Sequence, residues 1–479
     1  MNPWGSIHHR GNVFFSEVIY VSFLLSATPI LLFGVGIFYI LRLRGFYLLH
    51  PIRCIRLLFA RKPTDGISPF RAMTVALAGT LGVGNIVGVA SALYFGGAGA
   101  VLWMLVSALV AMVLKYAEIT LAVRHRRLSA DGSFTGGAPD YIRDGLAGAG
   151  LPRCGRVLGA VFALLCLMNA LTMGSLLQVN AVAGAMNQGF SVPPLVTGVA
   201  VALLAVVAVR GGAKRISALT EKLVPLMTLG FLVACVGVLI LRRERIPEAL
   251  ASILRDAREP LSAGAGIGGF LLSRGVKLGV MRGLVSNEAG CGTAPIAHAA
   301  ADTDLPARQG LFGLVEVFVD TVLLCTITAL CILVSDSGPN ACGEDTVRTA
   351  QVAFSSVLGE WAGGFFALSI LLFGVATVIC WAHYGRMCIV SLGGEGRRRH
   401  SPVADGIYTV LLAGALLFGA VAAPTPVWAL ADTAIALMTV LNLVILLLMH
   451  REVREETDRL FPRHTSAPCC IACKESIRR

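Results

Sequence analysis

Long apolar stretches, separated by short polar connections, follow one another along most of the chain. A helix needs about 20 predominantly apolar residues to cross the hydrocarbon core of a bilayer, and about eleven stretches meet that need. The stretch 262–300 is too long and too interrupted for one plain helix, so we expect a broken helix there. The pattern predicts an all-α integral membrane protein with about 11 transmembrane helices. The expected spans, with ends uncertain by several residues, are 16–41, 69–95, 99–122, 157–188, 193–209, 218–241, 262–300, 309–334, 363–392, 405–422 and 427–449.

The first apolar stretch is predicted to be a retained helix, because it is too long for a signal peptide and lacks a clear small-residue cleavage site. This N-terminal transmembrane helix and the cytoplasmic loop that follows it occupy residues 1–60. A ten-helix core is expected over 61–450, and a short charged cytoplasmic tail over 451–479.

Composition supports the membrane prediction. The chain is 56% hydrophobic and only 14% charged, whereas a soluble chain of this length needs a more polar surface. The net charge of +12 does not indicate nucleic-acid binding, because the basic residues lie between apolar stretches rather than on one domain. The lipid bilayer is therefore the expected partner of the surface.

The distribution of Lys and Arg predicts the orientation. With the N-terminus outside, roughly 27 basic residues fall on the cytoplasmic side and about 7 outside. One basic loop, around Arg242 to Arg258, falls outside against this trend, but it does not reverse the predicted orientation. We expect a multi-pass protein of a bacterial inner membrane, with its N-terminus outside and its C-terminus cytoplasmic.

A glycine cluster interrupts the second span. Gly82, Gly84 and Gly88 surround Asn85, although glycine costs a helix up to about 1 kcal/mol relative to alanine. The cluster predicts a discontinuous helix, whose free N–H groups suit a carboxylate and whose free carbonyls, with the Asn85 amide oxygen, suit sodium. The alternative is a close helix–helix contact through Gly84 and Gly88. The presence of Asn85 favours a binding site over a simple helix contact, because an amide at the membrane midplane is costly without a partner.

A second glycine cluster, residues 264–270, interrupts the seventh span. The two interrupted spans are five apart, which is typical of inverted five-helix repeats with a binding site at the midplane. The spacing thus predicts a secondary transporter whose broken helices meet around the ligand.

Ionisable residues inside the spans allow two interpretations each. Glu316 and Asp320 lie one helical turn apart, which suits a proton carrier, although hydrogen bonding to neighbouring helices is the preferred interpretation. Lys115 and Glu118 are three residues apart and are expected to neutralise each other. His298 is expected to be packed and hydrogen-bonded rather than a proton relay.

Several motifs closely resemble the signature of the alanine/glycine:cation symporter family. The most specific is Ser-Asn-Glu-Ala-Gly at 286–290, followed by Ala-Pro-Ile-Ala-His-Ala-Ala at 294–300. The resemblance extends from about residue 68 to 450 and implies a leucine-transporter-type fold with one extra N-terminal helix. It also implies sodium- or proton-coupled uptake of alanine or glycine. Further matches lie at 84–86, 88–90, 136–141, 308–311, 316–321, Trp381 and 384–385.

The resemblance also implies site residues. The backbone carbonyls of Thr80 and Leu81 would bind sodium together with Asn85, and Thr377 would serve a second sodium site. The residues expected to contact the amino acid are Gly82, Gly84, Asn85, Gln178, Gly268, Gly269 and Phe270.

The chain departs from the family pattern near these positions. Val83 and Ala376 stand where the family usually has hydroxyl residues, and the stretch after Phe270 is about three residues short. These departures bear on the number of coupled cations and on the substrate.

Two rival functions stay open. One is a proton-coupled or exchange permease for another small metabolite, which the lost hydroxyls favour. The other is a transport-dead receptor, although the tail after Met449 is too short for a soluble output domain. An enzyme is not expected, because the sequence shows neither a nucleophile–base set nor metal-ligand spacing. No cofactor is expected beyond the coupling ion, sodium or a proton.

Overall fold

A computed structural model of the chain describes residues 5–59, 66–128, 134–210, 212–258, 273–393 and 402–462. Within these residues the fold is helical, apart from a two-stranded antiparallel pair formed by β1 (Arg127–Leu128) and β2 (Phe134–Thr135). The α-helices of the N-terminal half are α1 (Gly5–Arg42), α2 (Phe46–Leu49), α3 (Pro51–Leu58), α4 (Pro69–Thr80), α5 (Val87–Gly96), α6 (Gly99–Arg124), α7 (Ala138–Gly148), α8 (Pro152–Leu171), α9 (Gln178–Phe190), α10 (Pro194–Arg210) and α11 (Gly212–Leu241).

The second half continues in the same way. Its α-helices are α12 (Ile246–Asp256), α15 (Arg274–Asn287), α16 (Ala294–His298), α17 (Pro306–Val317), α18 (Thr326–Val334), α19 (Thr346–Leu358), α20 (Trp361–Leu392), α21 (Pro402–Val421) and α22 (Pro424–Leu460). Short 3-10 turns form η1 (Val83–Asn85) and η3 (Arg243–Arg245). Two π-helical segments, η2 (Thr172–Leu177) and η4 (Phe318–Cys325), lie inside otherwise continuous helices.

Eight helices among the described residues are long and apolar enough to cross a membrane. Several expected spans are shorter pieces instead: the span at 69–95 consists of α4, η1 and α5, and the described part of 262–300 consists of α15 and α16. The long helices occupy Leu24–Arg42, Gly99–Arg124, Pro152–Phe190, Arg215–Leu241, Pro306–Val334, Trp361–Leu392, Pro402–Val421 and Pro424–Leu460.

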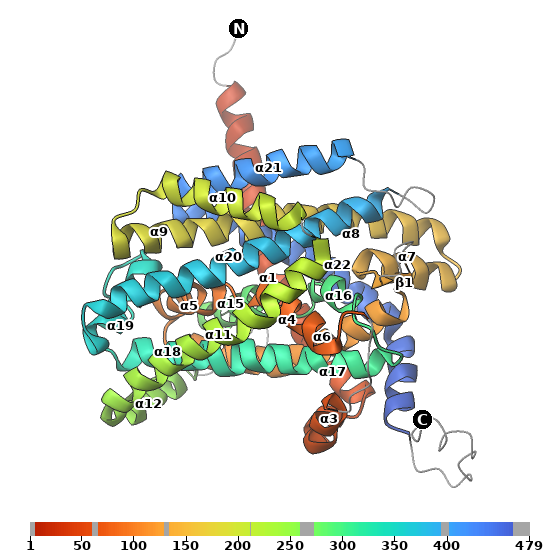
Figure 1. Cartoon of the computed structure of the whole chain (residues 1–479), viewed down its shortest axis with the longest axis horizontal. Helices are drawn as coiled ribbons and strands as arrows, with labels where there is room; N and C mark the ends of the chain where they lie inside the picture. The colour runs from red at the N-terminus through yellow and green to blue at the C-terminus, as the bar shows by residue number, and fades with distance from the viewer. Residues whose placement is uncertain are drawn as a thin grey trace.

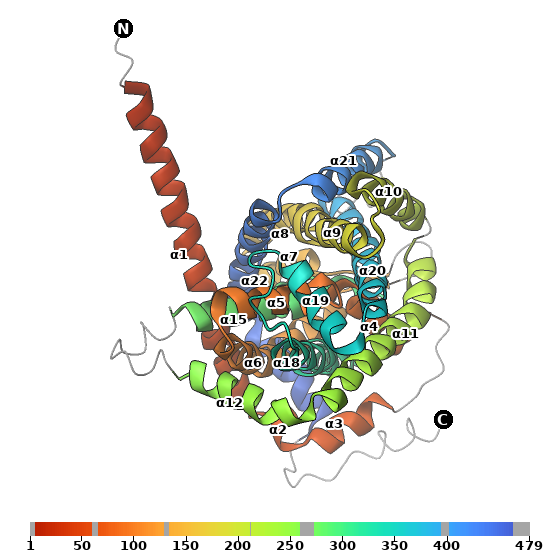
Figure 2. The ribbon, with the colours of Figure 1, turned by 90° about the vertical axis from the view of Figure 1, so that its left-hand side faces the viewer.

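The long helices run side by side. In Figure 1, α9, α20 and the α17–α18 helix cross the view in nearly the same direction, with α19 and α12 at one end and α7 and β1 at the other. Figure 2 looks along this bundle and shows α5 near its middle. The side chains of α4 from Ala72 onward are buried, as are those of α5 up to Leu93. The broken segment is therefore surrounded by protein, as irregular backbone at membrane depth requires.

Large apolar side chains cover the outside of the bundle. Leu203, Leu226, Val410 and Phe418, on α10, α11 and α21, are among the most exposed of these. In water such a surface would be costly, whereas in a bilayer it faces hydrocarbon. The exposed apolar surface agrees with the multi-pass membrane protein that the hydropathy pattern predicts.

Glycine allows a close contact between two of the helices. α17 lies against α6, and a Cβ added at Gly310 would come within 2.8 Å of Tyr116 Cδ2 and 2.9 Å of the Tyr116 carbonyl oxygen. No side chain fits at those distances unless a helix moves. The small residue thus sets the spacing between α6 and α17.

We expect Gly310→Ala to lower the free energy of unfolding by about 1–3 kcal/mol, because the methyl group overlaps backbone atoms of α6. Gly406→Ala, on exposed α21 with nothing within 4 Å of the added Cβ, is the matched control. It should leave stability unchanged or raise it slightly, since alanine is the better helix former. Thermal unfolding of the purified protein in detergent measures both. Equal midpoints for the two variants would contradict the packing role of Gly310.

Candidate functional site

The predicted break in the second span is confirmed. α4 ends at Thr80, and the Gly82 N–H donates to the Thr80 carbonyl over 2.7 Å. Leu81 between them has φ −72° and ψ 66°, the geometry of an inverse γ-turn. The chain then makes the η1 turn and becomes α-helical again at Val87. Backbone groups that a continuous helix would pair internally are thus left for other partners.

Two side chains from other helices supply such partners on one side of the break. The Val83 N–H donates to Gln178 Oε1 over 3.0 Å, and Gln178 Nε2 donates to the Met173 carbonyl over 3.2 Å. Thr377 Oγ1 lies 2.9 Å from the Ala78 carbonyl oxygen.

These contacts bring three of the predicted site residues together. A Cβ added at Gly82 would lie 2.7 Å from Gln178 Oε1 and 2.8 Å from Thr377 Oγ1. The space that Gly82, Gln178 and Thr377 share is therefore narrow.

Asn85 faces a different set of groups. Its Nδ2 donates to Asp320 Oδ1 over 2.7 Å and to the Asp320 carbonyl over 3.0 Å. The carboxylate of Asp320 also accepts from Ser286 Oγ at 2.6 Å and from Thr321 Oγ1 at 2.7 Å. Asn85 Oδ1 is buried and has no hydrogen-bond partner among the described residues. This oxygen is an acceptor left open beside a buried carboxylate.

The two interrupted spans meet at this point. A Cβ added at Gly84 would lie 3.4 Å from the Cα of Ser286 and 3.5 Å from the Val285 carbonyl oxygen, both on α15. An added Cβ would be in ordinary van der Waals contact there, so η1 packs directly against the backbone of α15. Of the predicted substrate residues, Gly268, Gly269 and Phe270 lie outside the described residues.

The seventh span is interrupted where the signature motif lies, whereas the glycine cluster expected to interrupt it, residues 264–270, lies outside the described residues. α15 ends at Asn287, and Glu288 takes the left-handed conformation with φ 53°, which is uncommon for a residue other than glycine. Glu288 Oε1 accepts from Trp381 Nε1 over 3.0 Å, and Glu288 Oε2 accepts from Thr293 Oγ1 over 2.6 Å. These two bonds tie the break to α20 and to the start of α16.

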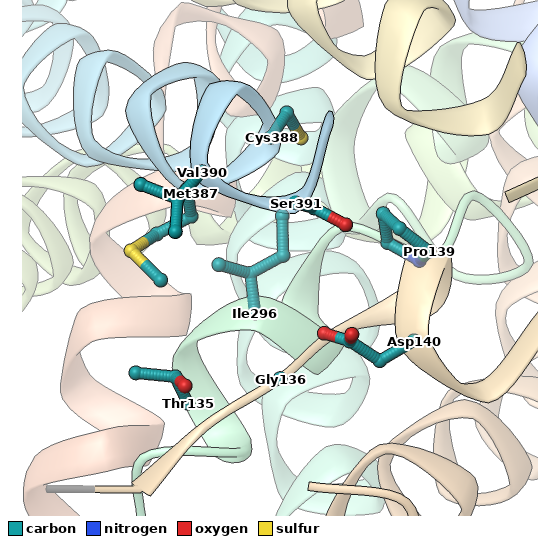
Figure 3. Close-up of a pocket in the computed structure, with 9 residues that line it drawn as sticks. All are labelled: Thr135, Gly136, Pro139, Asp140, Ile296, Met387, Cys388, Val390 and Ser391. Atoms are coloured by element: carbon teal, nitrogen blue, oxygen red, sulfur yellow. The ribbon is translucent and has the colours of Figure 1, made fainter. Parts of the chain in front are cut away.

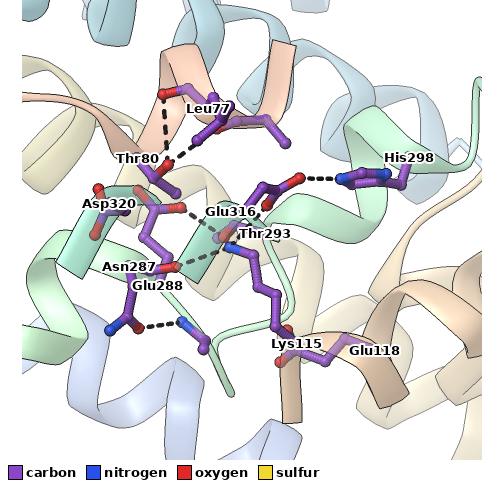
Figure 4. Close-up of polar contacts among 12 residues, drawn as sticks. Leu77, Thr80, Lys115, Glu118, Asn287, Glu288, Thr293, His298, Glu316 and Asp320 are labelled. Atoms are coloured by element: carbon purple, nitrogen blue, oxygen red, sulfur yellow. Dashed lines mark hydrogen bonds and ion pairs between the residues drawn. The ribbon is translucent and has the colours of Figure 1, made fainter. Parts of the chain in front are cut away.

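The expected pairing of Lys115 with Glu118 is wrong. Lys115 Nζ instead donates to the Asn287 carbonyl over 2.8 Å and lies 3.6 Å from Glu316 Oε2 (Figure 4). Glu118 accepts from the Gly292 N–H over 2.8 Å. Both residues sit on α6 but face different partners, because the free backbone groups of the second break attract each of them.

Glu316 and Asp320 do not pair with each other either. Glu316 is hydrogen-bonded to His298 Nε2, whereas Asp320 is bonded to Asn85 and Ser286. The π-helical segment η4 begins at Phe318, and its wider turn changes the direction of the side chains that follow. The preferred interpretation, hydrogen bonding to neighbouring helices, is confirmed, and so is the packed, hydrogen-bonded His298.

Sequence reasoning did not place Asp320 or Ser286 beside Asn85. The available signal was the presence of both residues inside matched motifs, at 316–321 and 286–290. Helical spacing pointed elsewhere because it assumes 3.6 residues per turn throughout.

A small cavity lies between α7, α16 and α20, at the end of the bundle near the β1–β2 pair (Figure 3). Its volume is about 20 Å³, enough for about one water molecule. Ile296 of α16 faces Met387 and Ser391 of α20 across it. The second broken segment and α20 are therefore packed closely at this end.

Membrane-length helices with two interrupted segments that meet around buried polar groups define a secondary transporter. The family model described as the sodium:alanine symporter family matches residues 13–467, so the chain belongs to this family. The resemblance seen in the Ser-Asn-Glu-Ala-Gly motif is confirmed. The protein is a cation-coupled amino-acid transporter of a membrane and not an enzyme.

Several relatives match most of the chain. A sodium/alanine symporter of Methanococcus maripaludis is 36% identical, over 89% of this chain and 92% of that protein. An uncharacterized transporter of Haemophilus influenzae is 36% identical, over 91% of this chain and 93% of that one. A probable sodium/glutamine symporter of Bacillus subtilis is 33% identical, over 88% of this chain and 85% of that one.

We expect Gln178→Met to lower the free energy of unfolding by about 1–3 kcal/mol, because it removes the hydrogen-bond partner of the buried Val83 N–H. Gln188→Met is the control on the same helix, since Gln188 is exposed and its amide donates to the side chain of Asp345. Thermal unfolding of the purified variants measures the difference. If Gln178→Met were as stable as Gln188→Met, Gln178 would not hold the break.

Proposed function

We propose that the protein takes up a small amino acid, alanine or glycine, together with sodium by alternating access. The observation that carries the proposal is the buried pair of Asn85 and Asp320 at the first break, with Asn85 Oδ1 left open. A buried carboxylate needs a positive charge nearby. A sodium ion or the ammonium group of an amino acid would supply it.

The proposed ion site combines the backbone carbonyls of Thr80 and Leu81 with the Asn85 amide oxygen, and oxygen atoms are the ligands that hard cations prefer. Asp320 adds the negative charge. Thr377 belongs to a second ion site, because its hydroxyl lies against the Ala78 carbonyl at the end of α4.

The proposed amino-acid site lies where the two breaks meet. Its carboxylate would contact N–H groups near Gly82 and Gly84, beside Asn85 and Gln178, with residues 268–270 completing the site. The narrow space at Gly82 favours a small side chain. The relative named as a sodium/alanine symporter supports alanine as the substrate. The relative named as a probable sodium/glutamine symporter makes glutamine a further substrate to test.

The proposed scaffold is the eleven-span arrangement, an N-terminal helix followed by two inverted five-helix repeats, with the N-terminus outside and the C-terminus in the cytoplasm of a bacterial cell. Rocking of one set of helices against the other would expose the site alternately to each side. α4–η1–α5 and α15–α16 are the corresponding interrupted segments of the two repeats.

A proton-coupled permease is the second candidate. Val83 and Ala376 offer no hydroxyl oxygen to an ion at positions beside the site, and a putative sodium/proton-dependent alanine carrier of Bacillus subtilis is 32% identical over 89% of this chain. The coupling ion is therefore the first quantity to measure.

We expect an inward sodium gradient to drive uptake of radiolabelled alanine or glycine into proteoliposomes, with a proton gradient of equal size driving little. Equal gradients without protein in the membrane give the background. Uptake driven by protons alone would replace sodium symport with the second candidate. Folded protein that takes up neither amino acid under either gradient would contradict the proposed substrate class.

Asn85→Ala should raise the sodium concentration for half-maximal uptake by at least about tenfold. The substitution removes an ion ligand and one donor to the Asp320 carboxylate, a loss of about 1–3 kcal/mol. Asn187→Ala, at an exposed position of α9, is the control and should transport normally. Unchanged sodium dependence in folded Asn85→Ala would exclude this residue from the ion site.

A further inference from the structure

The charges buried around the second break do not balance. Glu118, Glu288 and Glu316 are each at most 1% exposed, and Lys115 is fully buried. If all three carboxyl groups were ionised, one ammonium group would face three carboxylates in the middle of the bundle. Unpaired charge is very costly in such an environment, so protons or cations have to compensate it.

His298 does not provide the missing positive charge. Gln309 Nε2 donates to the Pro69 carbonyl over 3.2 Å and lies 2.7 Å from His298 Nδ1. Since the amide NH₂ is a donor only, His298 Nδ1 must accept. The ring is then neutral, and its Nε2–H donates to Glu316.

The remaining hydrogen bonds single out one carboxyl group. Glu316 Oε2 also has no hydrogen-bond partner among the described residues, but it lies 3.6 Å from the Lys115 ammonium group, and Glu316 Oε1 accepts from the His298 N–H. Both oxygens of Glu288 accept hydrogen bonds. Glu118 differs: its Oε1 accepts both from the Gly292 N–H at 2.8 Å and from Asn442 Nδ2 at 2.5 Å. Its Oε2 is buried and has no hydrogen-bond partner among the described residues.

We propose that Glu118 is a proton-binding site, with an exchangeable proton on Oε2 while Oε1 holds the second break through Gly292 and Asn442. The proton removes one negative charge from the interior without disturbing either bond to Oε1. The site is separate from Asn85, Asp320 and Thr377, and it does not rest on the proposed substrate or on sodium.

The described groups that face Glu118 are either uncharged or already paired. A proton is therefore the remaining way to neutralise the Glu118 carboxylate. Lys115 of α6, one turn away, is engaged by Asn287 and Glu316. Tyr39 of α1, Tyr141 of α7 and Cys291 of the break are uncharged in their usual protonation states at neutral pH. Their hydrogen bonds go to the Leu446 carbonyl, to Asn442 and to Thr439, respectively; Glu288 and His298 lie further along the network described above.

Loss of the proton would act on the second break. A charged Glu118 would compete for the Lys115 ammonium group three residues earlier on the same helix, and Lys115 holds the Asn287 carbonyl at the end of α15. Asn442 Nδ2 also donates to the Gly290 carbonyl over 2.9 Å, so the same network reaches both sides of the turn. Protonation of Glu118 therefore couples pH to the position of the broken helix.

Infrared spectroscopy of the full-length protein in lipid tests the proposal, because a protonated carboxyl group has its own carbonyl-stretch band. At neutral pH, Glu118→Gln should lose one carboxyl equivalent from this band, whereas Glu288→Gln and the exposed Glu244→Gln should keep it. Glu118→Asp, which retains a carboxyl group, should shift the band component rather than remove it, and serves where the glutamine variant does not fold.

Spectra recorded with sodium and with choline as the only added cation should agree. An undiminished band in folded Glu118→Gln, or a loss confined to Glu288→Gln, would overturn the assignment. A wild-type protein without any such band would show that a cation balances the charge, and the proton site would be wrong. Because the measurement needs no transport, failure of the uptake experiment and failure of this one are distinguishable.

Discussion

Interrupted helices inside a bilayer leave backbone N–H and C=O groups that water cannot reach, and the site depends on how these groups are satisfied. The Val83 N–H donates a hydrogen bond to Gln178, and the Ala78 carbonyl accepts one from Thr377. At the second break, Lys115 donates to the Asn287 carbonyl, and Glu118 accepts from the Gly292 N–H. Each partner comes from a continuous helix, so the continuous helices fix where the breaks lie.

Satisfying backbone groups in this way brings ionisable side chains into the interior. A lysine that caps α15 needs a carboxylate, which Glu316 provides, and Glu316 in turn is held by His298. The polar network of Figure 4 is therefore a consequence of the breaks rather than a separate feature. Its negative groups outnumber its positive ones, which makes the interior responsive to protons and cations.

The sequence was informative where a local signal exists. The glycines around Asn85 predicted a break because a helix tolerates them poorly, and α4, η1 and α5 confirm it. Hydropathy located the long helices, which depend on composition alone. The Ser-Asn-Glu-Ala-Gly motif indicated the family. The second break was predicted from residues 264–270, which lie outside the described residues, and the structure shows a break at the motif itself.

The sequence was uninformative where a residue's partner lies on another helix. Spacing paired Lys115 with Glu118, yet α15 and α17 provide the groups that Lys115 contacts. Asp320 lies in the π-helical segment η4 and contacts Asn85. No local sequence pattern predicted where this segment begins.

Both breaks gain their partners from a few identified side chains, and this limits how the broken helices can move. Tilting α15 away from α6 has to separate Lys115 from the Asn287 carbonyl, and moving the turn after it has to separate Glu288 from Trp381. Each separation exposes a buried polar group, which costs about 1–3 kcal/mol unless a new partner replaces the old one. A ligand or proton that binds at a break changes which partners are available there. The same hydrogen bonds that hold the breaks together are therefore the ones through which ions and substrate would select between conformations.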